Sequence, residues 1–266
     1  MKKVTVVGGD SRLITVKNRL ERGGFLVDTI GLFENDNGDI SSSQIVVLPV
    51  PTTRDGVNVF TPLTGKIIPL SIVEKSLRED ALVLCCNYSP KDADFIDYNR
   101  LDSYALLNAV PTAEGAIMLA IQNTAFTLFG SRCLIIGFGR VGKILADRLK
   151  GFGCDITVSA RKSSDFAHIN ALNMTCAHTR LLNENPLDYD IIFNTVDFPV
   201  LNENSLKNSK CKCIIDLSSK GGFNLEYAKS LNITAIKAPS LPALTAPETA
   251  GEFLAQTILD SINSQE

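Results

Sequence analysis

The sequence predicts an α/β protein of two Rossmann-like domains, each with a parallel sheet, with a cleft between them and two crossover helices linking them. Three observations lead to this prediction. Short apolar runs alternate with helical patterns along the chain, a glycine-rich turn lies near its middle, and 266 residues suffice for two modest domains. Strands that alternate with helices need right-handed crossovers, which favour parallel sheets. We expect residues 1–108 with 247–266 to form a substrate domain and residues 109–246 to form a dinucleotide-binding domain.

The first domain is predicted from apolar runs that end in polar or glycine-rich loops. Gly23 and Gly24 end its first helix. The glycines at 8 and 9 resemble part of a nucleotide turn, but no third glycine follows at the required spacing, so we expect this domain not to hold the cofactor. Loops 8–12 and 49–56 should face the cleft, because ligands of open α/β sheets bind at the carboxyl ends of strands. The predicted strands are 4–7, 25–30, 44–48 and 81–86, and the predicted helices are 11–22, 70–77 and a short piece at 92–98.

A long helix should connect the domains. We predict a crossover helix over residues 109–129, with Pro111 in its first turn, where proline is tolerated. A closing helix over 247–262, with Pro247 in its first turn, should return to the first domain. The second domain is predicted to contain strands at 133–136, 155–159, 173–177, 189–196, 212–217 and 233–237.

A dinucleotide fingerprint stands between the first strand and first helix of the second domain. It reads Gly137-Phe138-Gly139-Arg140-Val141-Gly142. Gly137 permits a tight turn, Gly139 lets a pyrophosphate approach the backbone, and Gly142 lets the helix pack on the strand. The helix N-terminus supplies free N–H groups and partial positive charge. A turn that only packs tightly is the alternative, but the flanking strand and helix favour cofactor binding.

The end of the next strand indicates which cofactor binds. NAD-specific sites place an acid there, whereas this chain has Ala160-Arg161-Lys162-Ser163. Cationic side chains and a hydroxyl suit a 2′-phosphate, so we predict NADP(H), with NAD as the alternative. Further cofactor contacts are expected from residues at strand ends and on the crossover helix, although turn and cap roles could also explain them: Asn194, Thr195, Ser218 and Thr112.

Composition excludes several classes of function. A net charge of −3 gives no basic field for nucleic acid, and the seven cysteines show no zinc-site spacing, so no metal is expected. We expect no signal peptide, and no apolar run long enough to span a bilayer. Reduced, structural thiols suit the cytoplasm.

Six segments occur in this order along the chain: 8–12, 48–51, 108–117, 137–142, 159–163 and 216–220. Together they make the chain similar to the A subunits of dipicolinate synthase, a family of spore-forming bacteria. The run N-A-V-P-T-A-E-G-A-I at 108–117 is the most specific of them and the glycine fingerprint the least. Ala243-Leu244 stands where the family pattern has glycine and lysine. More broadly, the layout resembles D-2-hydroxyacid and alanine dehydrogenases.

This resemblance implies that the chain, with a B subunit, oxidises dihydrodipicolinate from the lysine pathway to dipicolinate in the cytoplasm of the sporulating mother cell. A dicarboxylate substrate calls for cationic ligands, for which Arg12 and Arg54 are candidates. Lys220 is the first candidate for the base and Glu114 the second; each of these residues could instead be an ordinary solvated or helix-terminal group. Another NADP-linked dehydrogenase of a small carboxylic acid, or a regulatory module that binds a dinucleotide without turnover, remain alternatives. Whether the chain forms a homo-oligomer stays open.

Overall fold

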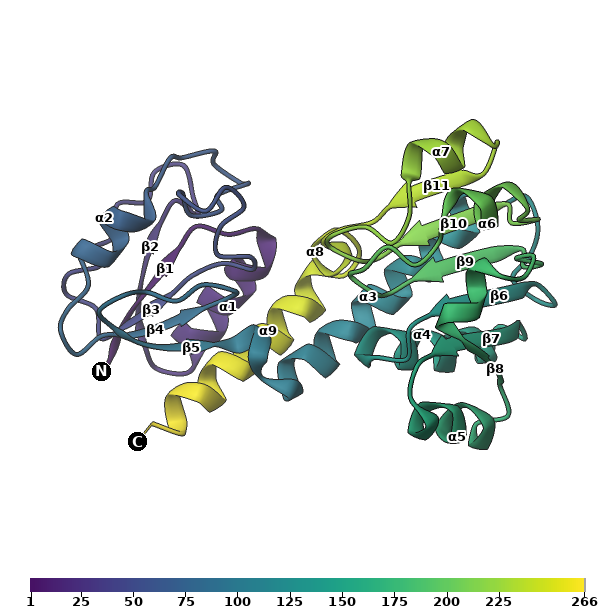
Figure 1. The fold of residues 1–266 in the computed structure, drawn as a ribbon. Helices are drawn as coiled ribbons and strands as arrows, with labels where there is room; N and C mark the ends of the chain where they lie inside the picture. The colour runs from purple at the N-terminus through teal and green to yellow at the C-terminus, as the bar shows by residue number, and fades with distance from the viewer. Residues whose placement is uncertain (266) are drawn as a thin grey trace. The chain divides into compact units, whose positions relative to one another are not determined.

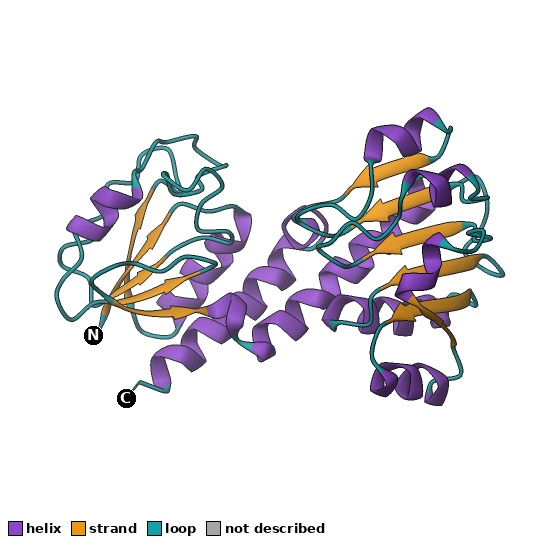
Figure 2. Ribbon diagram, viewed as in Figure 1, coloured by secondary structure: helices purple, strands orange, loops and turns teal. Residues whose placement is uncertain are grey.

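The computed structural model describes residues 1–265 and divides into two compact units. We call Met1–Asn108, together with the chain from Ala246 onward, the terminal unit, and Ala109–Thr245 the central unit. Each unit is built around its own parallel sheet, as the strands in Figures 1 and 2 show. The prediction of an α/β protein with two parallel sheets is confirmed.

The terminal unit holds a five-stranded sheet in the order β2-β1-β3-β4-β5. This is the 2-1-3-4-5 order of flavodoxin-like folds, in which ligands bind where the chain order reverses, between β1 and β3. The helix α9 comes from the far end of the sequence and packs beside α1, where Gly251 lies against Thr15. The elements are β1 Lys3–Val7, α1 Ser11–Arg22, β2 Leu26–Ile30, β3 Ile45–Val47, α2 Leu70–Lys75, β4 Leu82–Cys85, β5 Asp94–Asp97, the 3₁₀ turn η1 Tyr98–Arg100, and α9 Pro247–Asn263.

The prediction of a helical piece over residues 92–98 is wrong. Asp94–Asp97 is an edge strand that pairs in parallel register with β4, so that Phe95 lies opposite Val83. A four-residue segment is too short for its periodicity to separate strand from helix, and pairing with the sheet decides between them.

The central unit holds a six-stranded sheet in the order β11-β10-β9-β6-β7-β8. Read from β8, this is the 3-2-1-4-5-6 order of doubly wound dinucleotide folds, with the reversal at β6. The interior strands β6, β9 and β10 are buried along almost their whole length, because apolar clusters cover both faces of the sheet. The remaining elements are β6 Arg132–Ile136, α4 Arg140–Gly151, β7 Asp155–Ala160, α5 Ser163–Ala171, β8 Thr175–His178, η2 Thr179–Asn183, β9 Ile191–Asn194, α6 Glu203–Lys207, β10 Cys213–Asp216, α7 Leu225–Ser230, β11 Thr234–Lys237 and α8 Leu241–Thr245.

The crossover helix begins and ends earlier than predicted. The helix α3 runs from Asp102 to Gln122, so Pro111 lies in its interior and not in its first turn. The Pro111 carbonyl accepts a hydrogen bond from the Thr245 hydroxyl at 3.4 Å. At the end of the helix, the side chains of Asn123 and Thr124 donate to carbonyls of the last turn, in addition to the backbone N–H of Asn123.

The same helix corrects the expectation that no apolar run of this chain is long enough to span a bilayer. Within residues 1–265, α3 is the one helix whose length and apolar composition would allow it to cross a membrane. In this fold 44% of that stretch is buried, and its alanines at 113, 116 and 120 pack into the core of the central unit. A helix of this kind is typical of the core of a globular protein.

Candidate dinucleotide site

The glycine turn joins β6 to α4 at the point where strand order reverses. Gly137 has φ = +100°, a conformation that favours glycine. At Gly142, a methyl group built on the backbone would lie 2.2 Å from the Gly137 carbonyl oxygen, so the first turn of the helix touches the loop that precedes it. The Thr195 hydroxyl, which donates to the Ile136 carbonyl at 2.9 Å, closes the turn from the neighbouring strand β9. Both glycines therefore have the steric roles expected of the fingerprint.

The start of α4 is open to a ligand. Gly139 is its N-cap residue and has no side chain with which to cap the first N–H groups. A methyl group at Gly139 would meet no atom within 4 Å, which leaves space in front of the helix. Uncapped N–H groups and the helix dipole together favour a phosphate in this position.

A pocket of about 710 Å³ opens beside this turn, entirely within the central unit. It brings together six of the predicted cofactor residues: Gly137, Phe138, Gly139, Arg161, Lys162 and Thr195. Arg140, Val141 and Gly142 form the first turn of the adjoining α4, and Ser163 begins α5, directly after Lys162. The volume and this lining suit part of a dinucleotide, so the residues present fit such a group.

Sequence reasoning did not name most of the remaining residues that line this pocket. His178, Thr179 and Arg180 come from the end of β8 and the turn after it, and Asp197–Val200 follow β9. The rule that ligands meet the carboxyl ends of strands could have identified both segments, since each directly follows a strand. Asp165 in α5 and Asn183 complete the lining.

A buried polar network lies at the carboxyl ends of β9, β10 and β11. Its centre is Asp216, which is 2% exposed. The Asp216 carboxylate accepts hydrogen bonds from the Asn194 amide at 2.8 Å, the Ser218 hydroxyl at 2.6 Å and the Lys237 ammonium at 3.1 Å. The backbone N–H groups of Ser218 and Gly222 donate to the same carboxylate. Burial alone would raise the pKa of Asp216, but the bonds from Ser218, Asn194 and Lys237 hold it below its usual value.

This network fixes the loop after β10. Gly222 lies so close to Asn194 that a methyl group there would approach the amide nitrogen to 2.2 Å. Asn194 and Ser218, which we predicted as cofactor contacts, thus have their side chains engaged in the network. Lys237 was missed, although it ends the strand next to the one that ends in Asp216, and that position was a usable signal.

Lys220 lies on the same loop with an exposed side chain. Its backbone N–H donates to Asp197 at 3.3 Å, and the Ser219 hydroxyl donates to the same carboxylate oxygen at 2.9 Å. Burial raises the pKa of Asp197, but hydrogen bonds from Ser219 and Lys220, together with the charge of Lys220, hold it below its usual value. Because Asp197 lines the dinucleotide pocket, these contacts place Lys220 beside the rim of that pocket.

Two predicted site residues on the crossover helix, Glu114 and Thr112, do not line this pocket. Glu114 is exposed and pairs with Arg148 in the last turns of α4 at 3.6 Å. Since Arg148 is eight residues beyond the start of α4, about 12 Å along the helix, this geometry does not support Glu114 as a base beside the glycine turn. Thr112 lies on α3, half-buried, and is not among the residues that line the pocket.

In the terminal unit, the Arg12 side chain is buried and bonded to other residues of the protein. Its side chain is 3% exposed and forms a two-point pair with Asp10, at 2.9 and 2.8 Å. It also donates to the Val50 carbonyl, which joins the loop after β1 to the loop after β3. Burial lowers the pKa of Arg12, but the hydrogen bond and the charge of Asp10 outweigh burial and raise it. The alternative of a solvated helix residue is wrong, and the guanidinium is already used by partners within the protein.

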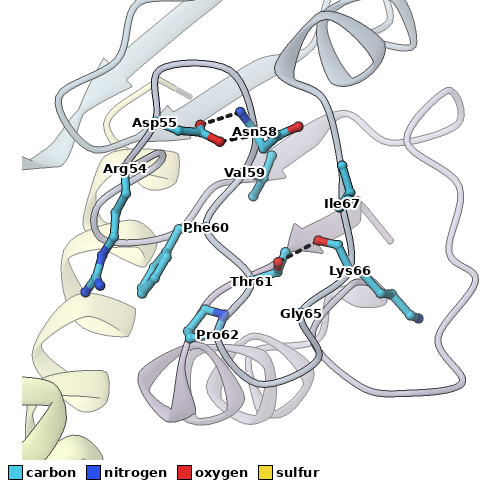
Figure 3. A pocket seen from close by; sticks show the side chains of 10 residues that line it. All are labelled: Arg54, Asp55, Asn58, Val59, Phe60, Thr61, Pro62, Gly65, Lys66 and Ile67. Atoms are coloured by element: carbon cyan, nitrogen blue, oxygen red, sulfur yellow. Dashed lines mark hydrogen bonds between the residues drawn. The ribbon is translucent and has the colours of Figure 1, made fainter.

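Arg54 is exposed on the loop after β3, and its guanidinium lies over the Phe60 ring, 4.1 Å from the ring centroid (Figure 3). Both residues line a shallow pocket of about 420 Å³. Asp55 holds the turn beside them by accepting from Asn58, and the Lys66 ammonium pairs with Asp36 at 2.9 Å. Hydrogen bonds from Asn58 and Val57 lower the pKa of Asp55. The pocket thus presents a cation on an aromatic platform, which suits a planar anion.

Family models match both parts of the chain. Residues 3–107 match the N-terminal domain of the dipicolinate synthase A subunit, and residues 112–198 match the NAD-binding domain of D-isomer specific 2-hydroxyacid dehydrogenases. Over 288 aligned residues the chain is 32% identical to the dipicolinate synthase A subunit of Bacillus subtilis strain 168, covering 96% of this chain and 94% of that protein. The chain belongs to the family of dipicolinate synthase A subunits. The resemblance predicted from sequence is confirmed.

Solved structures of this family superpose over nearly the whole chain. The A subunit from Bacillus halodurans is 28% identical, with a TM-score of 0.87 over 97% of each chain. The A subunit from Bacillus subtilis is 30% identical, with the same TM-score over 100% of this chain and 98% of that one. A transhydrogenase from Sinorhizobium meliloti, 12% identical with a TM-score of 0.72 over 99% of this chain and 93% of that one, shares the fold alone. Within residues 1–265, no group of three or more His, Cys, Asp or Glu side chains could hold a metal ion.

Proposed function

We propose that this chain is the NADP-dependent subunit which, together with a B subunit, oxidises dihydrodipicolinate to dipicolinate during sporulation, in the mother-cell cytoplasm. The observation that carries the proposal is the coincidence, in a member of the dipicolinate synthase A family, of a glycine turn at the strand-order reversal with a 710 Å³ pocket beside it. The chain's N–H groups at the start of α4 would hold the pyrophosphate. A dinucleotide held there would supply the hydride acceptor for the oxidation.

The dihydropyridine loses one hydride and one proton, and its ring becomes aromatic. The chain's own task is mainly to orient a planar dicarboxylate and to take up the proton. We assign carboxylate binding to Arg54 on its Phe60 platform, and the proton-accepting role to Lys220 at the pocket rim. Arg12 supports the terminal unit through its bonds to Asp10 and Val50. The residues from 109 to 245 would serve the dinucleotide, and the terminal unit the substrate.

The proposal is tested by supplying enzymatically made dihydrodipicolinate, NADP and the B subunit, and by following the ultraviolet absorbance of the pyridine product. We expect product only when cofactor is present, and tighter binding of NADP than of NAD in a parallel titration. Cofactor binding without turnover would instead indicate a regulatory module. Turnover with a different small acid, but not with dihydrodipicolinate, would indicate another dehydrogenase on the same fold.

Replacing Lys220 with alanine should lower turnover by about 100-fold or more, the usual contribution of a general base, while the NADP dissociation constant changes by less than about twofold. Steady-state kinetics and a cofactor titration measure the two effects. Lys229→Ala is the matched control, since Lys229 is exposed on α7 and pairs with Glu226. Wild-type turnover in Lys220→Ala would refute the role of this lysine.

A further inference from the structure

Three cations face one pocket from two different strands. Arg161 and Lys162 follow β7, and Arg180 follows β8, which is the neighbouring strand of the sheet. All three side chains line the 710 Å³ pocket, and all three residues are exposed. Arg180 is separated by eighteen or nineteen positions in sequence from the other two, so only the fold brings it to them.

These cations differ from other basic side chains of the central unit. Arg132 pairs with Asp188 and Asp190, Arg148 pairs with Glu114, and Lys237 pairs with Asp216. Among the residues that the structure describes, no carboxylate lies within ion-pair distance of Arg161, Lys162 or Arg180, although Asp165 lines the same pocket. Three uncompensated positive charges around one cavity favour an anionic ligand with several acceptor oxygens.

The backbone around Arg180 is fixed relative to β7. The Thr179 hydroxyl donates to the Ala160 carbonyl at 3.1 Å and lies 3.3 Å from the Ser159 hydroxyl. The Arg180 N–H donates to Nδ1 of His178 at 3.3 Å, which caps the turn η2. Ala160 immediately precedes Arg161, so these bonds hold the two arginine-bearing turns together. A subsite with a fixed frame and long cationic side chains can close on a phosphate without a change of fold.

We infer that Arg180 is a specificity-determining residue, which binds the 2′-phosphate of NADP together with Arg161 and Lys162. This inference rests on the proposed function, because it names a further residue of the proposed NADP site. The sequence fingerprint pointed only to the end of β7. The structure assigns an equal part to the end of β8.

The inference is tested on the full chain by titrating four probes: NADP, NAD, 2′,5′-ADP and 5′-AMP. The last two differ only in the 2′-phosphate and isolate the subsite from the nicotinamide half. For Arg180→Leu we expect affinity for NADP and 2′,5′-ADP to fall about tenfold, as for the loss of one charge-assisted bond, with NAD and 5′-AMP unchanged. Arg161→Leu should give the same pattern. Lys212→Met is the control for net charge, since Lys212 directly precedes β10 at the amino end of that strand and does not line the 710 Å³ pocket.

Equal weakening of all four probes would overturn the inference and place Arg180 against the adenine or ribose. Unchanged affinity for 2′,5′-ADP in Arg180→Leu would also overturn it. Arg180→Lys, which keeps the charge, should retain part of the preference for 2′,5′-ADP over 5′-AMP and provides a second variant should the leucine variant fold poorly. If the wild-type protein binds neither NADP nor NAD, the proposed function fails. If it binds NADP with an affinity that substitutions of Arg180 do not change, only this inference fails.

Discussion

Replacing Gly142 with alanine is expected to weaken dinucleotide binding by about 5- to 150-fold, because overpacking a tight contact costs about 1–3 kcal/mol. The added methyl group would lie 2.2 Å from the Gly137 carbonyl oxygen and 3.5 Å from the Thr195 hydroxyl. Gly137 cannot yield easily, since its own φ of +100° and its contact with Thr195 fix the turn. Either α4 or the glycine turn must move, and both hold the proposed phosphate position. Isothermal calorimetry measures the loss, since the chain has no tryptophan whose fluorescence could report binding.

Two other glycines of the same segment make the test specific. Gly151 ends α4, and a methyl group at this position would meet no atom within 4 Å, so Gly151→Ala should leave binding unchanged and raise stability by about 0.5–1 kcal/mol. Gly139→Ala also meets no protein atom, and it should weaken dinucleotide binding without destabilising the fold, because the methyl group occupies ligand space. Tight NADP binding by Gly142→Ala would contradict the assigned turn.

Replacing Asp216 with asparagine is expected to lower the free energy of unfolding of the central unit by about 3 kcal/mol, a cost typical of removing one partner from a buried, hydrogen-bonded ion pair. The neutral asparagine leaves Lys237 without its counter-charge. The asparagine NH₂ group is itself a donor, so it cannot accept the hydrogen bonds that the carboxylate oxygen in its place accepts. Turnover should fall as well, because loop 217–222 carries Lys220. Affinity for 5′-AMP, which needs only the adenosine end of the site, should stay near the wild-type value.

Urea unfolding and the turnover assay measure these effects, with Asp147→Asn as the control, since Asp147 is exposed on α4. The folded-state pKa of Asp216 lies below its unfolded value, so its contribution to stability is complete above the unfolded pKa and is lost as the pH falls through the folded pKa. The difference in stability between wild type and Asp216→Asn should therefore shrink in acid. A constant difference between neutral pH and a pH of about 2 would exclude the carboxylate as its source.

The elements with strong periodicity were predictable from sequence. The helix Ser11–Arg22 has the predicted bounds, and the strand before the glycine turn differs by one residue. Sequence failed where tertiary contacts decide: Asp94–Asp97 becomes a strand only because β4 offers an edge, and Pro111 is accepted inside α3. In both cases a local preference gave way to packing that no short window contains.

The candidate site shows the same division between features set by local sequence and features set by tertiary contacts. Gly137, Gly139 and Arg161 line one pocket, and their grouping was predictable because the fingerprint places them within one strand–turn–helix–strand segment. Arg180, Asp216 and Lys237 were not named from the sequence, because their neighbours come from other strands. No single segment of sequence reveals the order of the strands in a sheet. The burial of Arg12 was not predicted from the sequence. Its guanidinium is held by Asp10 and Val50 together, and Val50 lies 38 residues away.

The packing of α9 on α1 has a consequence for synthesis of the chain on the ribosome. Leu254, Ile258 and Ile262 complete the same apolar core as Val4 and Leu13, which are translated first. The terminal unit therefore cannot close its core until its last helix has left the exit tunnel, whereas the central unit has all of its strands earlier. The central unit can therefore complete its fold during synthesis before the terminal unit does, although most of the terminal unit precedes it in sequence.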